Sequence, residues 1–156
     1  MARSAARAAA MQLVYENLMG GGGEDTLGAL IAFTPEGDDQ AYIDATVAGI
    51  ESHAEELDAL IARYSTSRGL ARIARVDLCI LRVALYEMKY SHEVAESIAI
   101  NEAVELAKRF SEPASARFVN GMLGAISRGE QPEGKKDQPA SKPEQKADED
   151  GEKQDS

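Results

Sequence analysis

The chain has 156 residues and a formal net charge of −10, from 17 Lys and Arg against 27 Asp and Glu. Its longest apolar runs are far shorter than the roughly 18–20 residues that a membrane span needs, and its N-terminus shows no secretory cleavage pattern. The acidity argues against a non-specific nucleic-acid coat protein, although it allows a small local basic site. The single cysteine, Cys79, allows no intramolecular disulfide. We therefore expect a cytoplasmic protein in which Cys79 is a buried core thiol.

Composition divides the chain near residue 130. Residues 131–156 hold 5 basic and 8 acidic side chains, three prolines and only two non-polar residues. Such a segment cannot bury enough apolar surface to offset the entropy that ordering costs. The sequence therefore predicts one domain over residues 1–130, followed by a disordered charged tail over residues 131–156.

Helix-forming residues dominate the domain and alternating strand patterns are absent, so we expect an all-α bundle of six or seven helices with short loops. The first helix is predicted from about Ser4 to Leu18. The run Gly20–Gly23 ends it, since four consecutive glycines cannot hold a helix. Its apolar stripe is expected to leave Arg3, Arg7 and Gln12 on other faces.

A short helix is predicted over residues 26–33. Beyond it, apolar residues step by four and three along residues 39–64, which indicates a seam that faces the core or a partner. Ser52 and Glu55 have the spacing of a capping box, so two helices are expected to meet there. His53, beside the seam, is expected to be a solvated helix residue.

The next helix is predicted over residues 75–90. It is non-polar on nearly all sides, which is typical of a central, surrounded helix, and its few charges therefore need partners or a surface outlet. A further helix is predicted over residues 94–110, and a last one begins near Pro113, a favourable first-turn residue. Gly129 and Pro132 are expected to end the fold.

The sequence shows no catalytic pattern. Glu102 and Glu105 share a helix face, but a di-iron site needs histidines on the same helices, and this helix has none. The chain has only two histidines, His53 and His92, and no phosphate-binding, nucleophile-elbow or dinucleotide-binding motif. We therefore predict a non-enzymatic interaction module with no catalytic residue, no metal site and no cofactor.

Three strings in the second half resemble those of one family. They are ILRVALYE at residues 80–87, INEAVELAKRF at residues 100–110 and FVNGML at residues 118–123. Their order and spacing are similar to those of the NusB family of bacterial transcription antitermination factors. The first helix and the region of residues 48–50 fit more loosely, and the resemblance covers about residues 3–128.

The resemblance implies an all-helical fold of two packed halves, with three and four helices. It also implies a transcription antitermination factor that pairs with NusE, a small-subunit ribosomal protein. The pair would bind the single-stranded boxA element of nascent transcripts, notably of rRNA operons, within the transcription elongation complex. The sequence leaves open whether the chain is a monomer or a homodimer.

The resemblance places an RNA surface on the first helix and the start of the last. Arginines there would contact phosphates, and aromatic rings would stack on unpaired bases. Core packing is the alternative for the rings, and a frayed terminus is the alternative for Arg3. The first helix has fewer basic residues than is common in the family, so we expect weak binding of RNA alone and heavier dependence on NusE. The implied RNA-binding residues are Arg3, Arg7, Tyr15, Phe110, Arg117, Phe118 and Asn120.

The resemblance also implies a NusE surface that includes Asp77 and Arg82. An acidic domain would attract a basic ribosomal protein, while helix capping is the alternative role for Asp77. Leu78 stands where the family often has a basic residue. Two other functions stay open: a protein-interaction module of the same fold with weak or lost RNA binding, and the N-terminal domain of an rRNA cytosine methyltransferase. The latter would need a following catalytic domain, so we do not expect it.

Overall fold

The computed structural model describes residues 2–20, 35–65 and 70–130. Within these ranges the chain forms six α-helices, a 3-10 turn η1 and a π-helical turn η2, and no strand, so the predicted all-α class is confirmed. The predicted helix over residues 26–33 and the predicted tail lie outside the described residues. The elements are α1 (Ala2–Met19), α3 (Asp39–Ser52), α4 (Ala54–Tyr64), η1 (Leu70–Arg72), α5 (Arg75–Tyr86), η2 (Glu87–Ser91), α6 (Glu96–Phe110) and α7 (Pro113–Arg128).

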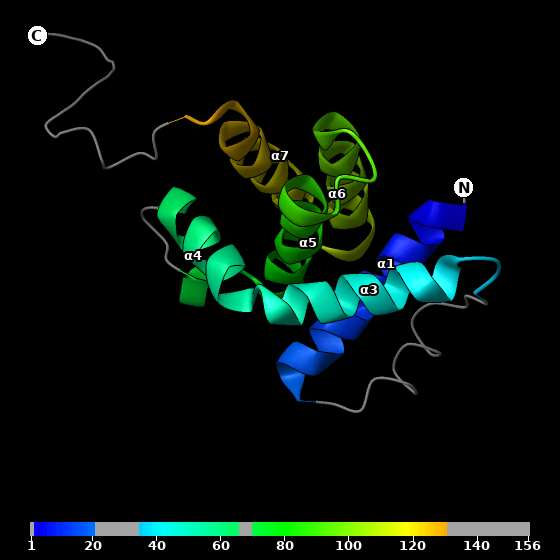
Figure 1. Ribbon diagram of the computed structural model, residues 1–156. Helices are drawn as coiled ribbons and strands as arrows, with labels where there is room; N and C mark the ends of the chain where they lie inside the picture. Colours follow the sequence, from blue (N-terminus) through cyan, green and yellow to red (C-terminus); the bar gives the residue numbers. More distant parts are fainter. Residues whose placement is uncertain (1, 21–34, 66–69, 131–156) are drawn as a thin grey trace, which may run out of the picture.

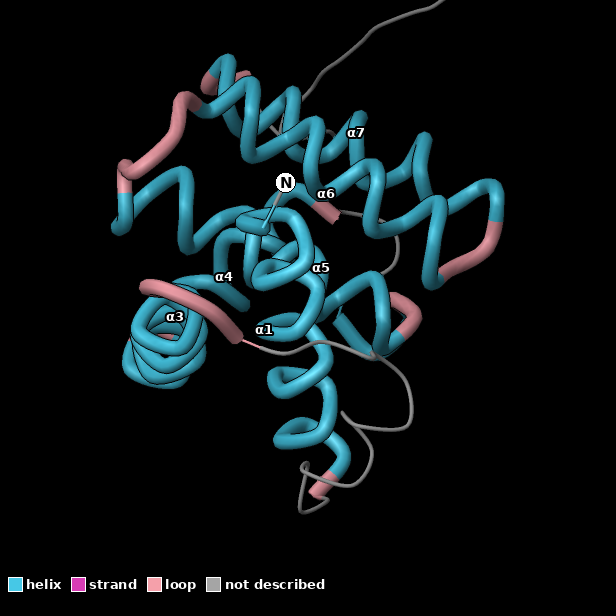
Figure 2. The backbone as a smooth tube through the Cα atoms, turned by 90° about the vertical axis from the view of Figure 1, so that its right-hand side faces the viewer, coloured by secondary structure: helices cyan, strands magenta, loops and turns pink. Residues whose placement is uncertain are grey.

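Helix α5 occupies the centre of the bundle, and every other described α-helix contacts it. Helices α1 and α3 cross below it in Figure 1, while α6 and α7 lie above it. Figure 2 shows α6 and α7 side by side along one edge of the molecule. The prediction of a central, surrounded helix is therefore confirmed.

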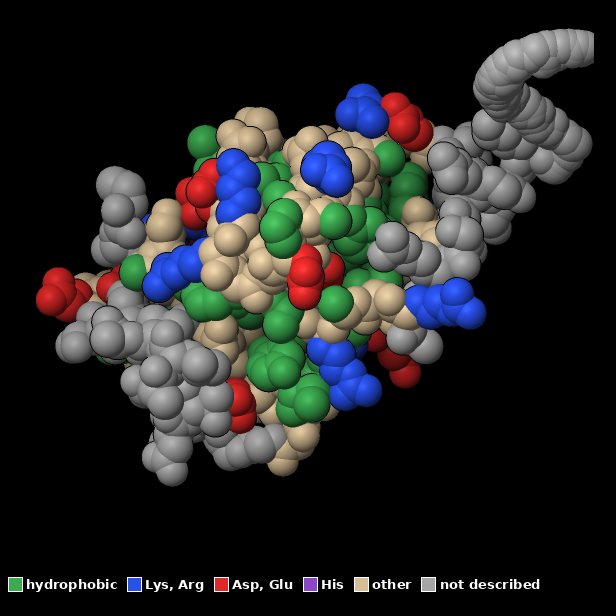
Figure 3. Space-filling model, turned by 180° about the vertical axis from the view of Figure 1, so that it is seen from behind, with side chains coloured by type: hydrophobic (Ala, Val, Ile, Leu, Met, Phe, Trp, Pro, Cys, Tyr) green, Lys and Arg blue, Asp and Glu red, His purple; other side chains and the backbone are tan. Residues whose placement is uncertain are grey.

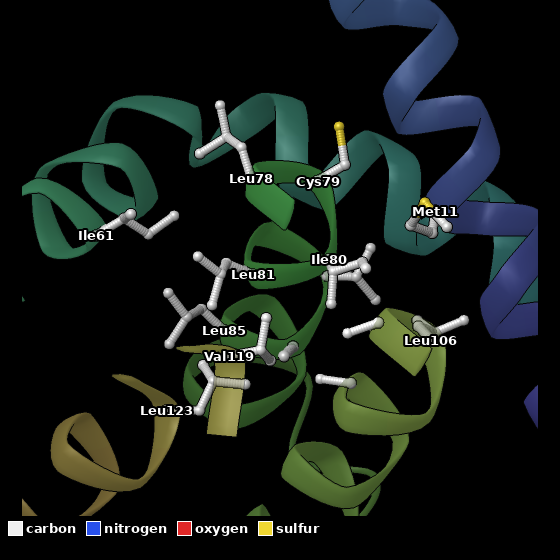
Figure 4. Close-up of a cluster of buried hydrophobic side chains, with 14 of the residues drawn as sticks. Met11, Ile61, Leu78, Cys79, Ile80, Leu81, Leu85, Leu106, Val119 and Leu123 are labelled. Atoms are coloured by element: carbon white, nitrogen blue, oxygen red, sulfur yellow. The ribbon is translucent and has the colours of Figure 1, made fainter. Parts of the chain in front are cut away.

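The main core forms around α5. Ile80, Leu81 and Leu85 are fully buried there and lie among side chains from α1, α4, α6 and α7 (Figure 4). Cys79 is also fully buried, which confirms the predicted core thiol. Desolvation raises the pKa of this thiol to about 12, so it stays protonated and unreactive in the folded protein.

Helix α1 packs against α3 through small residues. Ala6, Ala9 and Ala10 are fully buried against Tyr42 and Ile43 of α3, in a cluster separate from the main core. Methyl side chains allow two helices to approach closely. The alanine-rich composition of α1 therefore serves a tight helix contact.

The prediction that Arg7 and Gln12 lie away from the buried face of α1 is wrong. Both are buried, because α1 is contacted by α3, by α5 and, through side chains, by α6. A helix covered on several sides buries polar residues as well as its apolar stripe. Each buried polar group then needs a partner inside the fold.

The predicted break in residues 39–64 is confirmed, but not the capping box. Helix α4 begins at Ala54, and His53 is its N-cap residue, without a side-chain capping hydrogen bond. His53 is half-buried rather than solvated, since its ring stacks on Tyr90 with centroids 3.8 Å apart and planes 3° apart. The stack comes from a residue 37 positions away, which local spacing does not reveal.

The predicted helix over residues 75–90 is α5 followed by η2. This turn has π-helical geometry and ends at His92, whose φ of 59° is left-handed. Glu87 and Met88, at the start of this turn, are both buried. Helix α7 begins at Pro113, as predicted, and ends at Arg128, where Gly129 is the C-cap residue with a left-handed φ of 71°.

Candidate functional site

Arg3 lies where the first turn of α1 meets α3. Its Nη2 donates to Asp38 Oδ2 at 3.2 Å, and its guanidinium lies 4.2 Å above the centre of the Tyr42 ring. The predicted alternative of a frayed terminus therefore does not hold for this side chain. Its Nη1 is buried and has no hydrogen-bond partner among the described residues. The side chain as a whole is 31% exposed, so other parts of Arg3 remain at the surface.

Arg7 lies one turn further along α1, in the interior. Its Nε donates to Glu87 Oε1 at 2.8 Å, and its Nη1 lies 3.2 Å from Glu102 Oε1. Glu87 also accepts a hydrogen bond from the Tyr42 hydroxyl. The side chains of Arg7 and Glu87 are only 4% and 3% exposed. The structure therefore places Arg7 among internal carboxylates and not on a surface that RNA could reach.

The electrostatics of this cluster agree with its geometry. Burial alone would lower the pKa of Arg7, but the hydrogen bond to Glu87 and the attraction of the nearby carboxylates raise it. Desolvation and the negative charge of Glu87 raise the pKa of Tyr42. Arg7 therefore stays charged and Tyr42 stays a hydroxyl donor, so the cluster keeps its hydrogen bonds over the physiological pH range.

An open groove of about 410 Å³ separates the first turn of α1 from the second half of α6. It is lined by Ser4, Glu102, Glu105, Leu106, Lys108 and Arg109. Ser4 Oγ donates to Glu102 Oε1 at 2.9 Å across it. Lys108 pairs weakly with Glu105, with Nζ and Oε2 3.5 Å apart, so both partners remain exposed. Sequence reasoning missed Lys108 and Arg109, although they are two adjacent cations within the second family string.

The aromatic candidates all pack against the main core. Tyr15, Phe110 and Phe118 are half-buried there. The predicted alternative of core packing therefore holds for the buried part of each side chain. The Arg109 guanidinium lies 4.8 Å from the centre of the Phe110 ring, at the end of α6. This cation–π pair lies at the edge of the groove, which Arg109 lines.

Arg117 and Asn120 are exposed on α7. They are three residues apart and therefore lie on the same side of the helix.

On the face of the molecule opposite to that in Figure 1, basic side chains are separated from one another by acidic and apolar ones (Figure 3). The structure thus brings Arg3 and the groove together at one end of α1, while Tyr15 lies three turns away along the same helix.

Asp77 is buried at the start of α5. Its Oδ1 accepts from Ser111 Oγ at 2.6 Å and its Oδ2 from Ser115 Oγ at 2.7 Å. It therefore ties α5 to the turn between α6 and α7. The predicted alternative holds in part: Asp77 lies in the first turn of α5, where a carboxylate suits the helix dipole, but the N-cap residue Ala74 makes no side-chain capping hydrogen bond.

Arg82 binds a carboxylate of the neighbouring helix. Its Nε and Nη2 donate to the two oxygens of Asp58 in α4, at 2.9 and 2.7 Å. The side chain of Arg82 is 13% exposed. Both residues proposed for the partner surface are thus engaged within the fold.

The described residues contain no cluster of three or more potential metal ligands. No helix among them is long and apolar enough to cross a membrane. What they do offer is a set of exposed cations and partly exposed rings around α1, α6 and the start of α7. Such a set suits an unpaired nucleic-acid strand.

A family model described as the NusB family matches residues 4–128. The chain belongs to the NusB family. Among its relatives, the transcription antitermination protein NusB of Symbiobacterium thermophilum is 40% identical over 139 residues, covering 83% of this chain and 91% of the relative. The protein of that name from Thermoanaerobacter sp. (strain X514) is 47% identical over 94 residues, which cover 60% of this chain and 66% of the relative. This NusB-family chain thus matches just under two thirds of that relative's length.

Solved structures agree with this assignment. T. maritima NusB superposes with a TM-score of 0.72 at 29% identity, covering 83% of this chain and 93% of that one. A chain from a crystal structure of the antitermination factors NusB and NusE in complex with dsRNA superposes with a TM-score of 0.70 at 23% identity. That match covers 82% of this chain and 97% of the other. It shows that this NusB-family member shares the fold.

Proposed function

We propose that this NusB-family chain is a non-enzymatic transcription antitermination factor. It pairs with NusE, and the pair binds the boxA element of nascent RNA in the elongation complex, notably on rRNA operons. The family match over residues 4–128 carries the proposal. The relatives' name supports antitermination, and the solved complex of NusB, NusE and dsRNA supports both partners.

The RNA surface in this proposal centres on Arg3, whose side chain is 31% exposed, and on the groove beside it. Lys108, Arg109 and Arg117 supply further phosphate contacts, and Asn120 lies next to Arg117 on α7. The exposed parts of Tyr15, Phe110 and Phe118 supply faces for stacking. Four phosphate contacts predict a salt slope of about −3 on single-stranded RNA, at roughly −0.7 per contact.

The NusE surface in this proposal lies around the start of α5 and the turn between α6 and α7. The acidic character of residues 1–130, with 19 acidic and 12 basic side chains, would attract a basic ribosomal protein. Asp77 shapes this surface by holding Ser111 and Ser115. Arg82 shapes it by joining α4 to α5.

The test is a fluorescence-anisotropy titration of a boxA RNA and of a scrambled RNA, each with and without NusE. The proposal predicts tight, sequence-selective binding that develops mainly in the presence of NusE. Equal affinity for the two RNAs, with NusE bound, would favour a protein-interaction module of the same fold. The burial of Arg7 is the observation that favours this second function, since it leaves α1 with one arginine at the surface. Absence of binding to RNA and to NusE would contradict both.

A further inference from the structure

We propose that Arg7 is a positioning residue for RNA binding and makes no contact with RNA. This inference rests on the proposed function, because RNA is the ligand whose binding surface Arg7 would position. It concerns the cluster of Arg7, Glu87, Tyr42 and Glu102, which we call the α1 brace. The brace joins four separate elements: α1, α3, η2 and α6.

The brace lies directly beneath the surface formed by Arg3 and Ser4. Ser4, one turn before Arg7, donates to the same oxygen of Glu102 that Arg7 approaches. Arg3, four residues before Arg7, lies over the ring of Tyr42, whose hydroxyl Glu87 holds. The position of Ser4 is therefore linked to Arg7 through Glu102, and the position of Arg3 through Tyr42 and Glu87.

The charge of Arg7 is fully used inside this cluster. Removing it would leave the carboxylate of Glu87, which is 3% exposed, without a cation in the interior. A buried charge that loses its partner is strongly destabilising, so the surrounding elements must move or admit water. The first turn of α1 lies at the end of the helix, where local opening costs the least free energy, and would loosen first. Arg3 would then lose its fixed place beside the groove in the free protein, and its phosphate contact would form in the complex only at the cost of ordering this turn.

The test compares Arg7→Gln, Glu87→Gln and Arg3→Gln, each titrated with boxA RNA and NusE at several salt concentrations. Arg128→Gln serves as the control, because Arg128 is exposed and pairs only locally with Glu130. Circular dichroism at each titration temperature verifies that the variants are folded. Glu87→Gln keeps the size of the side chain. It therefore provides a folded variant for the binding measurement even if Arg7→Gln unfolds.

We expect Arg7→Gln and Glu87→Gln to weaken RNA binding about 2- to 30-fold with the salt slope unchanged. Arg3→Gln should reduce the slope by about 0.7, the loss of one phosphate contact. A decrease of about 0.7 in the magnitude of the salt slope for Arg7→Gln would overturn the inference. So would unchanged or tighter binding by Glu87→Gln, because a phosphate-binding Arg7 would be freed by that substitution.

Hydrogen exchange of the first turn of α1, without RNA, separates this inference from the proposed function. Arg7→Gln and Glu87→Gln should each lower the protection of backbone amides in this turn, while Arg128→Gln should not. If the wild-type chain binds no RNA, the proposed function fails. The hydrogen-exchange rates alone then test whether the brace fixes the first turn of α1. Unchanged protection in both brace variants would overturn the inference, whatever the RNA result.

Discussion

Asp77 shows how one buried carboxylate can organise a surface that it does not reach. Its two oxygens accept hydrogen bonds from the hydroxyls of Ser111, in the turn between α6 and α7, and Ser115, in the first turn of α7. The sequence contained a signal for this, since an acidic residue in a helix that is apolar on nearly all sides needs an internal partner. The identity of the partners could not be predicted, because Ser111 and Ser115 lie more than thirty residues away.

The substitution Asp77→Ala should therefore lower the free energy of unfolding by about 1–3 kcal/mol, since it leaves two serine hydroxyls without their acceptor. Urea unfolding measures the change. The control is Glu112→Ala at the same turn, where the side chain is exposed and the effect should stay within about 0.5 kcal/mol. Equal stability of the two variants, with NusE binding lost only in Asp77→Ala, would instead indicate a direct partner contact.

Cys79 gives a prediction about pH. Its pKa is about 12 in the folded protein against a reference value of 9.0, so the unfolded thiol ionises first as pH rises. The contribution of this residue to stability is complete below about pH 9 and is lost progressively between about pH 9 and 12. Cys79→Ala should therefore show a shallower loss of stability than the wild type in this range, measured by urea unfolding. Identical pH profiles would contradict the burial of the thiol.

At the scale of the element, periodicity predicted most helices because the apolar residues of most of them recur at a 3.6-residue repeat. The break between α3 and α4, the start of α7 at Pro113 and the central place of α5 follow from local pattern and composition. The burial of Arg7 could not be predicted in this way, because its partners Glu87 and Glu102 come from other elements. For the same reason, the candidate site was predicted in part: Arg3 and Arg117 lie at the surface, and Arg7 does not.

The contact of α3 with α5 depends on a glycine. A Cβ atom at Gly49 would lie 2.3 Å from Cε1 of Tyr86, so Gly49→Ala should destabilise the protein by about 1–3 kcal/mol through overpacking. Gly121→Ala is the matched control, because nothing lies within 4 Å of its Cβ position in α7. That substitution should stabilise the helix by about 0.5–1 kcal/mol. Thermal unfolding of the two variants should shift in opposite directions, and a shift of both in the same direction would contradict this packing.

At the scale of the whole molecule, an acidic chain is proposed to bind an anionic ligand. Its net charge of −10 opposes RNA at long range, while a few exposed cations near α1 and α6 provide local contacts. A basic partner resolves this conflict, since it would neutralise part of the acidic surface and add phosphate contacts of its own. The salt slope should therefore be steeper with NusE than without it. Equal slopes would show that NusE adds no phosphate contacts.

The central claim is that the chain supports antitermination. Its most direct test is transcription in vitro by RNA polymerase and elongation factors of the source organism, on a template with boxA upstream of a terminator. The account predicts that the chain and NusE together raise the fraction of transcripts that pass the terminator, and that a scrambled boxA abolishes the increase. Read-through that is the same with and without the chain, at concentrations where it binds NusE, would contradict the account.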